Sequence, residues 1–157
     1  MIFTKSYLKG GFLVNFRVSA VQYHLRTISS FNEFAQQVEH YIRTASEYET
    51  QFVLFPEFFT TQLMSIGNEK GEALRIDELP QFTEQYLQLF KKMAAKYDMH
   101  IVGGTHVIER KGKLLNMAHL FYPDGRVEEQ PKIHITPTEV EEWNMEAGES
   151  LNVFDTV

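Results

Sequence analysis

Short apolar runs alternate along this chain with longer segments whose apolar residues recur at helical spacing. The short runs are predicted strands, because they are rich in β-branched and aromatic residues: Phe16–Gln22, Phe52–Phe55, His100–Ile108 and Leu114–Tyr122. The longer segments are predicted helices at Phe31–Tyr48 and Pro80–Tyr97. Strands that alternate with helices in this way are typical of an α/β fold.

Local signals refine this pattern. Ser30 followed by Glu33 predicts a capping box at the start of the first helix. The polar stretch Thr60–Leu79 predicts a loop with one short helical piece. Leu151–Val157 is expected to begin another strand, and a chain that ends in mid-strand indicates truncation. Since few helices accompany the predicted strands, we expect one face of the sheet to be partly bare.

Composition excludes several classes of function. A net charge of -6 without clustered Lys and Arg argues against a nucleic-acid partner. The sequence contains no cysteine, which excludes a disulfide scaffold, a Cys-ligated zinc site and a thiol nucleophile within the chain. The apolar run near the N-terminus is too short for a signal peptide, and no longer one follows, so a cytoplasmic protein without a membrane segment is expected.

Glu57 is the first candidate for chemistry. It follows the apolar run Phe52–Phe55 and Pro56, so it is expected at the carboxyl edge of a buried strand, where open α/β sheets bind ligands. A carboxylate flanked by aromatic residues should be partly desolvated, which suits it to proton transfer. The alternative is a surface glutamate that happens to follow a strand.

Lys132 is the second candidate, because an ammonium beside a carboxylate can stabilise a developing oxyanion. The alternative is a solvated lysine on an edge strand. The histidines have no metal-ligand spacing, so neither a metal site nor a cofactor is predicted. A metal-dependent hydrolase built on them is the least favoured hypothesis.

Taken in order, several motifs resemble the nitrilase superfamily of carbon-nitrogen hydrolases. They cover the chain from residue 16 onward: Phe16–Gln22, Val53–Glu57, Ile101–Thr105, Leu115–Ala118 with Tyr122–Gly125, Pro131–His134, and Gly148–Thr156. Each motif is weak alone, whereas the ordered set is specific. Ile135–Glu139 followed by Trp143 is most similar to a branch that is sometimes fused to an acetyltransferase domain.

The resemblance implies a four-layer αββα sandwich of the nitrilase type, present here as its N-terminal half to two-thirds. Residues 16–157 would form the N-terminal part of the hydrolase domain, with residues 1–15 as a leader or linker. By position, Glu57 would be the general base and Lys132 the oxyanion partner. A second glutamate is typical of the family, and Glu139 is the first choice, with Glu141 and Glu142 as rivals.

The resemblance also implies a small-molecule amide or nitrile substrate, and a homodimer in the full-length protein. The family's cysteine nucleophile would lie beyond the end of this chain, so the 157 residues alone are expected to be inactive. A competing hypothesis is a non-catalytic binding or assembly module that keeps the fold and the pocket residues.

Overall fold

Seven strands form one mixed sheet in the part of the chain described by the computed structural model, residues 1–9, 12–67 and 71–156. In chain order they are β1 Ile2–Lys9, β2 Phe12–Ala20, β3 Phe52–Leu54, β4 His100–Arg110, β5 Lys113–Phe121, β6 Val127–Pro131 and β7 Met145–Glu146. Strands β1 to β6 lie in sequence order across the sheet, and β7 pairs with β5. Strands β2, β3 and β4 are parallel, so their carboxyl ends meet at one edge of the sheet.

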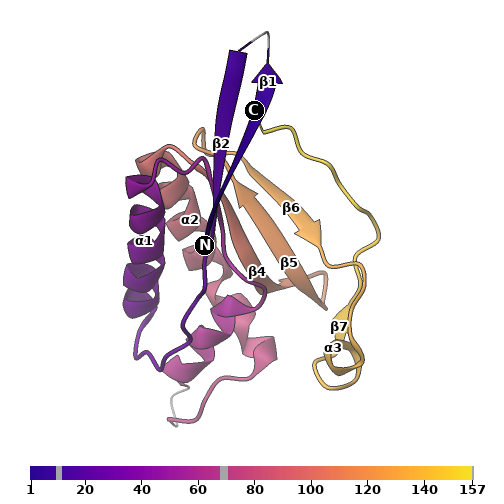
Figure 1. The fold of residues 1–157 in the computed structure, drawn as a ribbon. Helices are drawn as coiled ribbons and strands as arrows, with labels where there is room; N and C mark the ends of the chain where they lie inside the picture. The colour runs from indigo at the N-terminus through magenta and orange to yellow at the C-terminus, as the bar shows by residue number, and fades with distance from the viewer. Residues whose placement is uncertain (10–11, 68–70, 157) are drawn as a thin grey trace.

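Two long helices lie side by side on one side of this sheet (Figure 1). The helical elements are α1 Phe31–Glu47, the 3-10 helices η1 Phe59–Ile66 and η2 Ile76–Phe82, α2 Thr83–Tyr97, and the short α3 Pro137–Glu141. The alternation of strands and helices confirms the predicted α/β class. None of the helices described is both long and apolar enough to cross a lipid bilayer.

The N-terminal cap of α1 differs in one detail from the predicted capping box. The Oγ of Ser30 accepts a hydrogen bond from the backbone N of Glu33, as predicted. The Glu33 carboxylate instead accepts from the backbone N and the Oγ of Ser29, one residue earlier. The predicted start of the helix is therefore correct, but the carboxylate of Glu33 bonds Ser29 rather than the backbone of Ser30.

Replacement of Ser30 by alanine is expected to lower the free energy of unfolding by about 1 kcal/mol, because an N-terminal amide of α1 loses its acceptor. Urea denaturation followed by circular dichroism would measure the loss. Ser46→Ala in the last turn of the same helix is the matched control, since its hydroxyl only returns a bond to the Arg43 carbonyl. Equal losses in the two variants would contradict the capping role.

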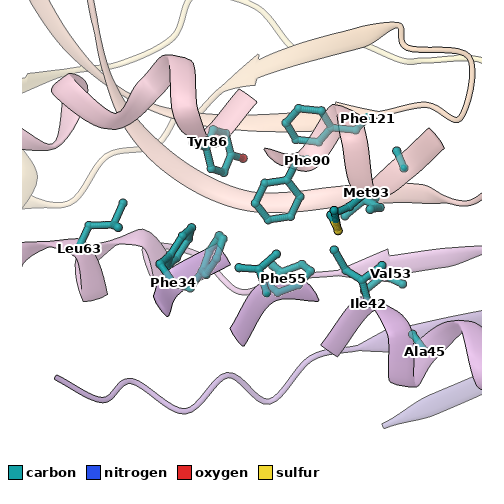
Figure 2. Packing of buried hydrophobic residues seen from close by; sticks show 14 of the residues in the cluster. Phe34, Ile42, Ala45, Val53, Phe55, Leu63, Tyr86, Phe90, Met93 and Phe121 are labelled. Atoms are coloured by element: carbon teal, nitrogen blue, oxygen red, sulfur yellow. The ribbon is translucent and has the colours of Figure 1, made fainter. Parts of the chain in front are cut away.

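The hydrophobic core lies between the two helices and the sheet. Phe34 and Ile42 of α1 and Phe90 of α2 are fully buried, as is Val53 of β3. Figure 2 shows these side chains meeting in one cluster that also includes Phe121 of β5. The helical spacing of apolar residues in the sequence thus corresponds to the faces that the helices bury.

Two histidines are buried within this core. His106 of β4 is fully buried, stacks on the Tyr86 ring, and shares hydrogen bonds with the hydroxyls of Thr60 and Thr83. His119 of β5 is 1% exposed, and neither ring nitrogen has a hydrogen-bond partner among the described residues. Burial favours the neutral imidazole in both rings, although the Glu129 carboxylate lies 3.6 Å from His119 Nε2 and opposes this effect there.

The sheet face opposite the helices is only partly covered. In β3, Val53 is fully buried on the helix side, whereas the next residue, Leu54, points to the other face and is 36% exposed. An alternating strand places successive side chains on opposite faces, so this difference reports on the two sides of the sheet. The expectation of a partly bare face agrees with this exposure.

Two predicted segments differ from the structure in their bounds or in their elements. The stretch 60–79 contains parts of both η1 and η2 rather than a loop with one helical piece, while its residues 68–70 lie outside the described residues. The first predicted strand, Phe16–Gln22, is β2, which begins earlier, at Phe12, because β1 pairs with it from Phe12 to Ser19, and which ends at Ala20. The assignment of residues 1–15 to a leader or linker stays a prediction.

The predicted strand at Leu151–Val157 is wrong for its described residues 151–156, which have no regular secondary structure. A strand needs a neighbour to complete its hydrogen-bond ladder, and none of the strands described pairs with this segment. Side chains hold it instead. Gln130 bonds the backbone of Ser150 and Asn152, and the Tyr122 hydroxyl donates to the Asp155 carbonyl.

Candidate active site

Glu57, Lys132 and Glu139 come from three separate segments and meet in one ion-pair cluster. The Lys132 Nζ lies 3.0 Å from Glu57 Oε1 and 2.8 Å from Glu139 Oε2. Glu57 follows β3, Lys132 directly follows β6, and Glu139 belongs to α3. Two carboxylates thus share a single ammonium group.

A bulge in β4 holds the loop that carries Glu57. The pairing of β4 with β5 shifts between Val102 and Thr105, and Gly104 within the bulge has φ +62°. A Cβ at Gly104 would lie 2.2 Å from the Pro56 carbonyl oxygen, so only glycine allows the two backbones to approach this closely. The Thr105 Oγ1 then accepts a hydrogen bond of 2.9 Å from the backbone N of Phe58.

The position of Lys132 is set by backbone bonds on both sides of it. Its N–H donates to the Asn116 carbonyl at 2.9 Å, and its carbonyl accepts from the Gly148 N–H at 2.8 Å. The first bond extends the β5–β6 pairing past Pro131, which cannot donate, and the second ties Lys132 to the segment after β7. The ammonium also lies 5.9 Å from the centre of the Phe58 ring.

Glu139 is 1% exposed and accepts four hydrogen bonds. Its Oε2 accepts from Lys132 Nζ and from both the backbone N and the Oγ1 of Thr136, and its Oε1 accepts from Asn116 Nδ2. Burial by itself raises the pKa of Glu139, but the bonds from Lys132, Thr136 and Asn116 outweigh it and lower the pKa to about 2. Burial lowers the pKa of Lys132, and its bonds to the two carboxylates raise it by more.

Glu57 is half-exposed, with 49% of its side chain accessible, so the expected desolvation of this carboxylate is wrong for the described chain. Its aromatic neighbours in sequence pack elsewhere. Phe59 is buried in the core, and Phe58 makes an edge contact with Trp143. Glu57 Oε1 accepts from Asn116 and Lys132, whereas none of the described donors reaches Oε2. One oxygen of the carboxylate is therefore anchored and the other is available.

Among the rival glutamates, the structure brings Glu139 rather than Glu141 or Glu142 to Lys132. Glu141 and Glu142 are both exposed. Glu139 is held in the site because its carboxylate bonds the backbone of Thr136, the N-cap residue of the short helix α3.

Asn116 is a member of the cluster to which sequence reasoning gave no role. It is 1% exposed in β5, and its Nδ2 donates to Glu57 at 2.8 Å and to Glu139 at 3.0 Å. Its Oδ1 is buried with no partner among the described residues, an arrangement that costs about 1 to 3 kcal/mol. The available signal was a polar residue within the mainly apolar run Leu114–Ala118.

A pocket of about 440 Å³ reaches Trp143, and the residues that line it do not include Glu57, Lys132 or Glu139. Its lining includes Met64, Arg75 and Ile76 from the region 60–79, together with Trp143, whose ring contacts Phe58 next to Glu57. No group of three or more His, Asp or Glu residues in the described part of the chain is arranged to hold a metal ion.

The sequence was compared with protein-family models and with known proteins. The model of the family described as carbon-nitrogen hydrolase matches residues 17–157. The probable hydrolase YhcX of Bacillus subtilis is 46% identical over 153 residues, which are 98% of this chain and 29% of that protein.

Two solved structures share the fold. Saccharomyces cerevisiae Nit3, a member of branch 10 of the nitrilase superfamily, has a TM-score of 0.68 at 21% identity, covering 90% of this chain and 51% of Nit3. A mutant of the amidase from Nesterenkonia sp. AN1, with acrylamide added at its active site cysteine, has a TM-score of 0.63 at 18% identity. That match covers 86% of this chain and 50% of the amidase. The chain thus spans about half of each structure and less than a third of YhcX.

Proposed function

Because the chain belongs to the carbon-nitrogen hydrolase family, we propose that it supplies the glutamate, lysine and second glutamate of a hydrolase acting on small-molecule amides or nitriles. The observation that carries the proposal is the cluster of Glu57, Lys132 and Glu139 beside an open carboxylate oxygen. In this proposal residues 16–157 are the N-terminal part of the catalytic domain. The nucleophilic cysteine lies outside the 157 residues, since the sequence has none.

We infer a role for each group in amide cleavage. Glu57 Oε2, the oxygen without a described donor, takes the proton of the cysteine thiol. The resulting thiolate attacks the amide carbonyl carbon, and the negative charge that develops on the carbonyl oxygen is stabilised by the Lys132 ammonium. Glu57 then returns the proton to the leaving nitrogen as the carbon-nitrogen bond breaks.

A thioester remains after the amine leaves, and water completes the cycle. Glu57 accepts a proton from the attacking water, the sulfur leaves, and the thiol is restored with that proton while the acid product departs. Glu139 stays ionised throughout, because four hydrogen bonds favour its charged form. It keeps Lys132 protonated and in place.

A chimera tests this proposal, in which residues 1–157 replace the matched portion of YhcX and the remainder of that relative completes the domain. We expect the chimera to release ammonia from members of a panel of small-molecule amides, with YhcX assayed beside it. Glu57→Gln should lower kcat of the chimera about 100-fold, because general base catalysis is lost. The 157-residue chain alone should release no ammonia.

Glu141→Gln is the matched control, because Glu141 is an exposed glutamate of α3 outside the cluster. It should leave kcat unchanged. A folded but inert chimera beside an active YhcX would contradict the proposal, as would a Glu57→Gln chimera with full activity.

A non-catalytic binding or assembly module is the second candidate, and the absence of cysteine from the sequence is the observation that favours it. It predicts that the 157-residue chain is stable and monodisperse by itself and that the chimera is inert. Homodimer formation stays a prediction from the resemblance, and a cytoplasmic location stays a prediction from the sequence.

A further inference from the structure

We propose that Asn116 is the positioning residue of this site, holding the Glu57 and Glu139 carboxylates on a single amide nitrogen so that the open oxygen of Glu57 is aimed for proton transfer. This inference rests on the proposed hydrolase function for its catalytic consequence. Its structural part rests on contacts within the described chain.

The first observation is that one residue contacts all three charged groups or their backbone. The Asn116 Nδ2 donates to Glu57 Oε1 at 2.8 Å and to Glu139 Oε1 at 3.0 Å. The backbone carbonyl of Asn116 accepts from the Lys132 N–H at 2.9 Å. Glu57 lies in the loop after β3, Lys132 follows β6 and Glu139 lies in α3, so Asn116 is the point at which three distant segments are tied to β5.

The second observation concerns the chemistry of the amide group. A primary amide carries two hydrogens on one nitrogen, so it can serve two carboxylates at once, whereas a hydroxyl can serve only one. If the amide were turned over, Oδ1 would face two carboxylate oxygens. The orientation of Asn116 is therefore dictated by two ionised acceptors.

The third observation is that the fold tolerates an unsatisfied group to keep this orientation. Asn116 is 1% exposed, and with Nδ2 committed to the carboxylates, Oδ1 is left buried without a described partner. Buried polar atoms are nearly always paired, so an unpaired one calls for a local reason. The link between Glu57 and Glu139 supplies that reason.

These contacts fix the orientation of the Glu57 carboxylate. Lys132 and Asn116 both contact Oε1, which fixes one oxygen of a half-exposed carboxylate and leaves Oε2 on the open side. Without Asn116, the two carboxylates would share only Lys132, and their mutual repulsion would separate them. A small displacement of a general base is enough to lower kcat about 100-fold while substrate binding is retained.

Two variants separate hydrogen bonding from packing. Asn116→Asp keeps the shape of the side chain and removes both N–H donors, and Asn116→Ser keeps one donor and adds no charge. Thr50→Val is the control, because Thr50 is a buried polar residue whose hydroxyl pairs with Ser19 rather than with the site. Thermal unfolding of each variant shows whether it is folded.

The first readout uses the 157-residue chain and needs no activity. Exchange of the Lys132 ammonium protons with water, measured by nitrogen-15 NMR at neutral pH, is expected to accelerate about tenfold in Asn116→Ser, because the loss of one hydrogen bond lets the two carboxylates move away from the ammonium. Thr50→Val should leave it unchanged. An unchanged exchange rate in a folded Asn116→Ser chain overturns the proposal.

The second readout uses the YhcX chimera. We expect kcat to fall about 100-fold in both Asn116 variants with KM within about threefold of the parent. A loss confined to KM, or an unchanged kcat, overturns the positioning role even if the parent chimera is active. If the parent chimera is inert although folded, the proposed function fails, and the ammonium exchange rate still decides whether Asn116 holds the cluster.

Discussion

Acidification from pH 7 to pH 4.5 is expected to lower the free energy of unfolding by about 5 kcal/mol, through the two buried histidines. Burial, reinforced by repulsion from His119, lowers the pKa of His106 to about 3. Burial likewise lowers the pKa of His119 to about 4, against an attraction from Glu129 that raises it. The ordinary value for both is 6.5.

Below pH 6.5 the two histidines of the unfolded chain therefore become protonated. In the native chain they stay neutral until the pH approaches 4. Each proton contributes about 1.4 kcal/mol per pH unit, so the slope should approach about 2.7 kcal/mol per unit between pH 6 and pH 4.5. A loss of this size is comparable with the whole stability of many domains. Below pH 4.5, protonation of Glu139, whose pKa is lowered to about 2, adds a further loss.

Urea denaturation at closely spaced pH values would measure this slope. Replacement of both histidines by glutamine should flatten it, even though the double variant is less stable at pH 7. His24→Gln serves as the control, because His24 is exposed. If the wild-type stability is level from pH 7 to pH 5, the histidines are not buried as neutral rings.

Lys132→Met is expected to lower the free energy of unfolding by about 3 to 5 kcal/mol at pH 7, since it leaves the buried Glu139 carboxylate without its counterion. Methionine keeps most of the side-chain volume, so little of the loss comes from packing. The pKa of Glu139 should then rise from its lowered value, because only the bonds from Thr136 and Asn116 remain to oppose burial. Because a carboxyl with a raised pKa takes up a proton as the pH falls, the deficit should narrow between pH 7 and pH 5.

Chemical denaturation of wild type and variant at both pH values tests this expectation. Lys113→Met is the matched control, because Lys113 forms an exposed ion pair with Glu146. It should leave the free energy of unfolding nearly unchanged, because both partners are exposed. A pH-independent deficit in Lys132→Met would instead point to lost packing.

Much of the fold was predictable because it follows from local periodicity. The helix at residues 31–47 and the strands that flank it are specified by apolar spacing and by turn residues, both of which act over a few positions. Only one short helical piece was predicted where two 3-10 helices form, because their short turns produce no sustained periodicity. The segment after Leu151 was misassigned because a strand depends on a partner as well as on its own sequence.

The candidate site was predictable as a set of positions and less so as a set of contacts. Glu57 and Lys132 stood out from the ordered motifs, and the structure places them 3.0 Å apart. The choice among Glu139, Glu141 and Glu142 required the path of α3, and the role of Asn116 required knowing which face of β5 meets the loop after β3. Such long-range contacts leave no periodic trace in the sequence.

The short helix α3 ties local folding to the chemistry of the site. Five residues are too few for a helix to persist by itself, and its N-terminus is closed by the Glu139 carboxylate, which also binds Lys132. The negative charge of Glu139 therefore holds the segment folded. Any change that neutralises this carboxylate weakens its bond to the Thr136 backbone and exposes that backbone to solvent. A substitution in this turn will consequently change the position and the pKa of the Lys132 ammonium, even when the altered residue never approaches a substrate.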